Sequence, residues 1–229
     1  MSLLRHAALA VLLCSAAARA QSAAPTEAGS APAPQTGFQM ALRTGYGLPF
    51  GNSSGAPGDT YKGLVSGQVP VMLDIGGKLS HHVFLGGYLG LGFGGVGSEL
   101  KGICATPDVT CVHASFRLGA QLQYNFAPAA KANPWLGYGI GIESTGVGAS
   151  GPAGDTTMTA VGWELARLMA GVDFRLSHAV GIGPFADFSV GRYSRVTLKE
   201  ASGSETSGDL QDKAAHEWLT LGVRFVLFP

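Results

Sequence analysis

The most constraining feature of this chain is a series of eight amphipathic β segments whose connections alternate between long and short. The segments lie at residues 38–50, 67–79, 83–95, 113–126, 134–147, 157–176, 180–193 and 215–228. Long links lie at 51–66, 96–112, 148–156 and 194–214, and they alternate with short links at 80–82, 127–133 and 177–179. An even number of antiparallel strands, with long loops at one end and tight turns at the other, is typical of a β-barrel that spans a membrane between two compartments.

Each segment alternates apolar residues with small or polar ones. In segment 113–126, one phase holds the apolar residues Phe116, Leu118, Ala120, Leu122, Tyr124 and Phe126. The other phase holds Arg117, Gly119, Gln121, Gln123 and Asn125. Because successive side chains of a strand point to opposite faces, this pattern gives each strand one apolar face and one cramped hydrophilic face.

The same alternation fits a soluble barrel that turns its apolar face inward around a ligand. Charged residues make up 13% of the chain, however, against roughly 25% in a soluble domain. Small residues and scattered charges of both signs suit the narrow lumen of an eight-stranded barrel better than a solvated exterior. We therefore predict an all-β fold, an eight-stranded antiparallel transmembrane β-barrel with up-and-down meander topology, over residues 38–229.

The first 37 residues differ in composition from the rest. Arg5 and His6 precede an apolar run, and Ala18-Arg19-Ala20 supplies small residues for cleavage before Gln21, which predicts a signal peptide over 1–20. Residues 21–37 are rich in Pro, Ala and Ser and hold few large apolar side chains, so we expect a flexible periplasmic segment. We find no basic patch with interleaved aromatic residues, so no nucleic-acid partner is expected.

Two cysteines remain after removal of the signal peptide, Cys104 and Cys111, and both lie in link 96–112. In an exported protein, such a pair favours a structural disulfide over a reactive or metal-binding site. His113 alone does not complete a zinc site. We predict no metal and no other cofactor.

Ten charged residues of the segments fall on the cramped hydrophilic face. They are Arg43, Asp74, Lys78, Arg117, Glu143, Arg167, Asp173, Arg175, Asp187 and Arg224. We predict a network in which opposite charges satisfy one another inside a filled lumen. The alternative is a selective pore lining, but open aqueous porins use about 16 to 18 strands. Glu164 and Arg192 fall in the apolar phase, which places them above the membrane or after a bulge.

A catalytic interpretation is also open. His113 and His216 lie near the long-link ends of their segments, where a lipid-facing site could modify lipid A, and Ser115 and Ser194 lie at comparable heights. No spacing ties either serine to a histidine as nucleophile to base. We predict no enzymatic activity.

The last segment ends in an apolar series at every second position: Leu219, Leu221, Val223, Phe225 and Leu227. With the alternating segments and the signal peptide, this series resembles the small eight-stranded outer-membrane proteins of the OmpA, OmpX and OmpW type. Members of that group usually end in an aromatic residue that the assembly machinery recognises. Here Pro229 is terminal and Phe228 comes one place early.

The resemblance implies a bacterial outer-membrane location, contact with outer-membrane lipid, and insertion by the barrel assembly machinery. We expect a monomer with a structural or surface-interaction role, in which four extracellular loops meet an extracellular partner. A narrow channel for small or hydrophobic solutes is the alternative that the OmpW-type resemblance permits, and a lipid A modifying enzyme is a further one.

Overall fold

The computed structural model describes residues 36–56, 58–152 and 154–229. The predicted signal peptide and all but the last two residues of segment 21–37 lie outside this part of the chain. The strands are β1 (Gly37–Gly51), β2 (Val65–Lys78), β3 (Val83–Val96), β4 (Thr110–Asn125), β5 (Ala132–Gly151), β6 (Gly154–Arg175), β7 (Val180–Lys199), β8 (Glu205–Asp209) and β9 (His216–Leu227). Two one-turn helices, α2 (Tyr61–Leu64) and α3 (Lys101–Cys104), lie in the links.

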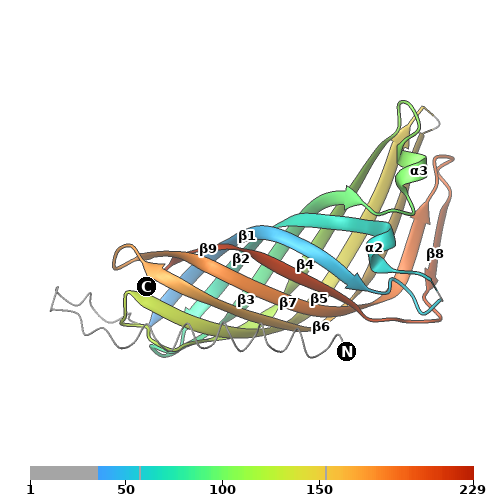
Figure 1. Ribbon diagram of the computed structural model, residues 1–229. Helices are drawn as coiled ribbons and strands as arrows, with labels where there is room; N and C mark the ends of the chain where they lie inside the picture. Colours follow the sequence, from blue (N-terminus) through green and yellow to red (C-terminus); the bar gives the residue numbers. More distant parts are fainter. Residues whose placement is uncertain (1–35, 57, 153) are drawn as a thin grey trace, which may run out of the picture. The chain divides into compact units, whose positions relative to one another are not determined.

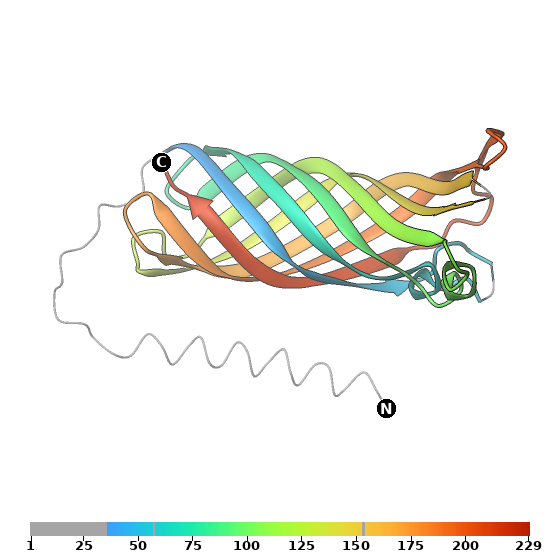
Figure 2. The same ribbon diagram turned by 90° about the horizontal axis from the view of Figure 1, so that it is seen from above.

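Eight of the strands close a ring. Neighbours in the order β1, β2, β3, β4, β5, β6, β7 and β9 pair antiparallel, and β9 pairs back to β1. Figures 1 and 2 show the resulting barrel from two directions. Closure leaves no unpaired edge within the ring. The predicted eight-stranded antiparallel barrel is confirmed, and β8 is an additional strand that pairs with β7 outside the ring.

The outward face of the barrel is apolar. Leu122 and Val223 are 50% and 48% exposed, whereas their chain neighbours Gln123 and Arg224 are 0% exposed. An exposed apolar face that runs all round a closed barrel is stable against lipid and not against water. The ring strands have between 12 and 22 residues, more than the 9 to 11 that a tilted strand needs to cross a bilayer. This is a transmembrane β-barrel.

Some of the exposed aromatic side chains lie at the two ends of the apolar face. Phe38, Phe126 and Phe174 are exposed near the short turns, and Phe50 and Phe93 are exposed near the long links. Such girdles flank the apolar band of transmembrane barrels, because aromatic rings favour the membrane–water interface. No helix in the described residues is long and apolar enough to cross a membrane.

Two of the predicted long links are largely strand. β5 continues to Gly151 and β6 begins at Gly154, so the predicted loop at 148–156 is wrong. In the link at 194–214, β7 continues to Lys199 and β8 returns beside it. The extensions project beyond the ring, as Figure 1 shows. Continuous pairing of β5 with β6, as far as Gly151 opposite Gly154, explains the difference at 148–156, because a ladder of backbone hydrogen bonds does not require an alternating apolar pattern.

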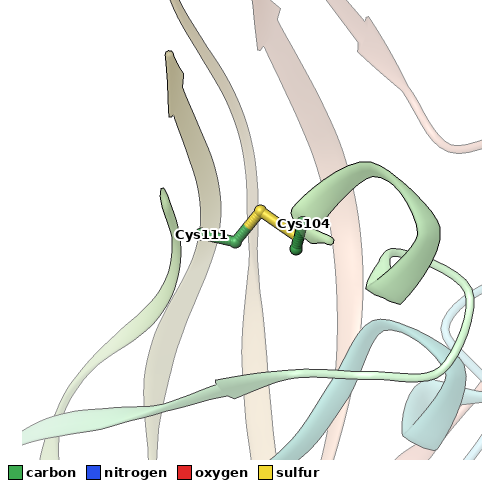
Figure 3. Close-up of a disulfide and its surroundings, with 2 residues drawn as sticks. All are labelled: Cys104 and Cys111. Carbon is green, nitrogen blue, oxygen red and sulfur yellow. A yellow bond between two sulfur atoms is a disulfide. The ribbon is translucent and has the colours of Figure 1, made fainter. Parts of the chain in front are cut away.

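The remaining long links hold the two helices. Thr60 caps α2, because its hydroxyl accepts a hydrogen bond from the amide of Gly63. Cys104, at the end of α3, forms the predicted disulfide with Cys111 at the start of β4 (Figure 3). The disulfide therefore closes a small loop within a single link.

Candidate functional site in the barrel lumen

All ten sequence-predicted charges are buried inside the barrel, each at most 8% exposed. Glycines on the inner wall make room for the larger side chains. The ring of Tyr88 lies across Gly119 and Gly141, and a Cβ atom on Gly141 would lie 2.6 Å from the Tyr88 hydroxyl. The small residues of one strand thus accommodate the bulky residues of another, which fills the lumen.

Arg43 is the centre of the lumen network. Its guanidinium donates two hydrogen bonds to Asp74, at 2.8 and 2.9 Å, and one to Asp187 at 2.9 Å. These three residues come from β1, β2 and β7. Fork-shaped pairing of this kind gives the strongest type of charge-assisted hydrogen bond.

The network continues toward the long-link end through alternating charges. Arg167 lies 3.3 Å from Asp187 and 2.9 Å from Glu164, and Glu164 lies 3.3 Å from Arg117. Tyr88 donates a hydrogen bond to the other oxygen of Glu164. A continuous chain of ion pairs thus crosses the lumen, with each carboxylate between cationic or hydroxyl groups.

Glu164 reaches the lumen because of a bulge. The pairing of β6 with β7 shifts register between Glu164 and Ala166, and that of β6 with β5 shifts opposite the same point. One extra residue reverses the phase of alternation, so Glu164 and Arg167 both point inward. Periodicity alone placed Glu164 on the apolar face. Of the two explanations offered for it, a position above the membrane or a bulge, the structure shows the bulge. Arg192 stays outward and exposed, opposite Trp163 of β6.

A second group of charges fills the short-turn end. Arg224 donates to Asp173 and to Gln123, each at 2.9 Å, and its guanidinium stacks on Trp135 with 4.3 Å to the ring centroid. The indole nitrogen of Trp135 donates to the other Asp173 oxygen at 3.2 Å. Every oxygen of this buried carboxylate therefore has a donor, as burial of a charge requires.

Lys78 and Arg175 close the short-turn end around Phe228. The guanidinium of Arg175 lies 4.5 Å from the centroid of that ring and donates to the carbonyl oxygens of Pro128 and His178. The Lys78 ammonium lies 5.9 Å from the same ring and has no hydrogen-bond partner among the described residues. Cation–π attraction is its main favourable contact.

The long-link end of the lumen holds an aromatic and acidic cluster. Glu143 lies 3.8 Å from Arg117 and 2.5 Å from Nε2 of His216. The ring of Tyr193 stacks on His216 at 4.1 Å, and Arg117 lies over Trp218 at 5.5 Å. Sequence periodicity does not predict that these aromatic rings meet, because they come from separate strands.

Tyr61 covers this cluster from above. It is the first residue of α2, it is 1% exposed, and its hydroxyl lies 2.7 Å from that of Tyr193. Its ring meets Trp218 edge-on with centroids 5.4 Å apart. Burial raises the pKa of Tyr61, so its hydroxyl stays protonated and available for hydrogen bonding at neutral pH.

A cavity in the lumen, lined by Gln68, Met72, Ser115, Arg117 and Thr220, has a volume of about 10 Å³. A cavity of roughly 10 to 15 Å³ holds a single water molecule.

The histidines do not form the lipid-facing site considered above. His113 and His216 are buried on the lumen side, 1% and 0% exposed, and His113 Nε2 lies 2.8 Å from the Thr145 hydroxyl. The Ser115 hydroxyl donates to Gln68 and that of Ser194 to a carbonyl of β6, so neither donates to a histidine. The catalytic alternative, which needs these histidines on the lipid-facing side, gains no support from them, because strand phase turns both rings inward.

Metal binding has no support in the part of the chain that the structure describes. No group of three or more His, Cys, Asp or Glu side chains there is arranged to hold an ion. Glu143 and His216 are a pair, and their neighbours are aromatic rings and an arginine. The chemistry of the lumen is that of paired charges.

No family model and no curated protein matches the sequence. Among solved structures, the fold is similar to a major outer membrane protein from Thermus thermophilus, with 12% identity over 83% of this chain and 99% of that chain, at a TM-score of 0.48. It is also similar to the outer membrane protein OprG from Pseudomonas aeruginosa, with 12% identity over 84% and 97%, at a TM-score of 0.47. The outer membrane protease OmpT from Escherichia coli is similar at 8% identity over 90% and 100%, with a TM-score of 0.47. At such identities the likeness concerns the fold.

Proposed function

We propose that this chain is an integral, monomeric outer-membrane protein whose lumen does not conduct and whose long-link end serves as an interaction surface outside the cell. The observation that carries the proposal is the ion-pair chain from Asp74 to Glu143, which spans the lumen beneath Tyr61. An open pore would require these pairs to separate.

Separation of buried ion pairs is unfavourable. Removing one partner of a buried pair costs about 3 to 5 kcal/mol, because the remaining charge is left without compensation in a medium of low polarity. Several pairs in series here share partners, so opening the lumen would expose several charges together. The network therefore favours a structural role for the lumen charges over a selective pore lining.

The external role follows from the asymmetry of the two ends. The short turns span few residues, whereas the long-link end carries the disulfide loop and the extensions of β5, β6 and β7 with β8. In outer-membrane barrels the short turns face the periplasm and the longer loops face outward. Exposed loops on a rigid barrel are well suited to binding an external partner.

Planar-bilayer recordings test the closed lumen, and they also address the alternative of a narrow channel. Purified protein should insert without stable conductance steps. The double variant Arg43→Ala/Arg167→Ala removes two large side chains from the lumen and serves as the comparison that should leak, provided it folds. Reproducible unitary openings of the unaltered protein would contradict the proposal.

Surface proteolysis tests the orientation. A protease site inserted at Ser202, in the turn between β7 and β8, should be cut on intact cells. The same site at His178, in the short turn before β7, should be cut only after the outer membrane is opened. The reverse pattern, or a soluble protein, would reject the assignment.

The proposal includes no enzymatic activity. Lipid A from cells with and without this protein should give the same mass spectrum. A mass difference that depends on the protein would instead favour the lipid A modifying enzyme.

A further inference from the structure

A second cavity lies at the long-link end, above the Tyr61 ring and outside the lumen network. Its volume is about 300 Å³. Tyr61 and Tyr193, which close the lumen, line it together with Thr145. Cavities of roughly 300 Å³ and more are the usual size of small-molecule sites. The place of α2 beside the extensions of the ring strands can be followed in Figure 1.

Much of the wall of this cavity is apolar. This part is formed by Leu64 of α2, Leu210, and the inward side chains of the strand extensions, namely Val147, Met158, Ala160 and Val196. The opposite face of the same extensions is polar and carries Thr157, Thr159, Thr197 and Ser207. The extensions thus keep an apolar face on the side of the cavity, where Val147 and Val196 are partly buried against the cluster that contains Tyr61 and Tyr193.

Two carboxylates, Asp59 and Glu99, are the only acidic groups among the lining residues, and no lysine, arginine or histidine of the described chain lines the cavity. Asp59 accepts a hydrogen bond from the Ser54 hydroxyl at 2.5 Å. Glu99 lies over Gly63, where an added Cβ atom would lie 2.6 Å from its carboxyl carbon. Neither carboxylate forms an ion pair with a described residue.

We propose that this cavity binds a small organic cation with an apolar body, such as an alkyl or aromatic amine. The apolar body would lie against Val147, Met158 and Val196, and the ammonium group would lie toward Asp59 and Glu99. Charge complementarity favours a cation over an anion, because the lining residues include two carboxylates and no basic side chain.

The access of this site from outside the cell rests on the proposed function, whereas binding itself does not. Binding is therefore measured on purified protein in nanodiscs of zwitterionic lipid, where either orientation exposes the cavity to solution. A failure to bind would leave the conductance and proteolysis results unaffected. Conversely, a conducting barrel could still bind the cation.

Three probes of nearly equal shape distinguish the contribution of charge to the binding affinity from that of apolar contact. They are 4-phenylbutylamine, 4-phenylbutanol and 4-phenylbutanoate. Calorimetric titration at neutral pH, with empty nanodiscs subtracted, should give the amine about two- to fivefold tighter binding than the alcohol, because both carboxylates are exposed and water screens their attraction for the ammonium group. The carboxylate probe should bind more weakly than both.

Variants locate the site. Asp59→Asn/Glu99→Gln should bring the affinity for the amine down to that for the alcohol, while the alcohol is unaffected. Asp155→Asn/Glu205→Gln removes two exposed carboxylates outside the cavity and should change nothing. Val196→Trp fills the cavity and should abolish binding of all three probes. Gel mobility of the folded barrel checks that each variant has folded.

Three results would overturn the proposal. They are no saturable binding to the unaltered protein, equal affinities for amine and alcohol, and unchanged amine affinity in the Asp59→Asn/Glu99→Gln variant.

Discussion

The contribution of a charged residue to the stability of this protein depends on whether its side chain is buried or exposed to solvent. Arg43 and Arg195 each pair with an aspartate at about the same distance, 2.8 and 3.1 Å, yet the first pair is buried and the second is about two-thirds exposed. Water screens the exposed pair and cannot reach the buried one. The same geometry therefore has very different consequences for stability.

Replacing Arg43 by Ala should lower the free energy of unfolding by about 3 to 5 kcal/mol, because Asp74 loses its partner inside the lumen. Arg195→Ala is the matched control and should cost about 0 to 1 kcal/mol. Urea-induced unfolding in detergent micelles, followed by tryptophan fluorescence, measures both. Equal losses in the two variants would argue against a buried network.

Gly141→Ala should also destabilise the barrel, by about 1 to 3 kcal/mol, the usual cost of overpacking. The new methyl group would collide with the Leu118 carbonyl oxygen and lie 2.6 Å from the Tyr88 hydroxyl. Gly208→Ala in β8 is the control, since a Cβ atom there has no neighbour within 4 Å. The same unfolding assay applies, and a cost at Gly208 that matched the cost at Gly141 would refute the crowding explanation.

At the scale of elements, sequence periodicity predicts the ring strands well but predicts their extensions at the long-link end poorly. Every apolar side chain of segment 113–126 from Phe116 to Phe126 alternates with a smaller or polar one, and the structure keeps that register. Periodicity fails where a bulge reverses the phase, as at Glu164, and where small residues leave no alternating pattern, as at 148–156. At such places the backbone conformation depends on the pairing of two strands. The sequence of one segment alone does not predict that pairing.

The disulfide is confined to one connection, which limits what it stabilises. The variant Cys104→Ser/Cys111→Ser should leave the unfolding of the barrel unchanged within about 0.5 kcal/mol, since distant surface changes seldom cost more. The link between β3 and β4 should instead become more accessible to protease at residues 105–109. Mass spectrometry of the fragments measures this, and a large loss of barrel stability would contradict a local role.

The whole molecule combines an apolar exterior with a lumen that contains paired charges. The ten lumen charges could be chosen from the sequence because strand phase separates inward from outward positions where no bulge intervenes, whereas the bulge concealed Glu164. The pairing of the lumen charges could not be predicted, because Arg43 and Asp187 are 144 residues apart and meet only when the ring closes. The same is true of the cavity at the long-link end, whose walls come from separate parts of the chain.

The central claim is that apolar side chains of the ring strands face the lipid and hydrophilic ones face the lumen. Quenching of tryptophan fluorescence by brominated lipids tests this claim most directly. Trp135 and Trp218 are 1% exposed inside the lumen, whereas Trp163 is 62% exposed on the outer wall. In a Trp163→Phe background, the two lumen tryptophans should be quenched only weakly. Adding Leu122→Trp should introduce strong quenching by lipids brominated along the acyl chain. Strong quenching of the lumen tryptophans, with none at position 122, would contradict the assignment of inner and outer faces.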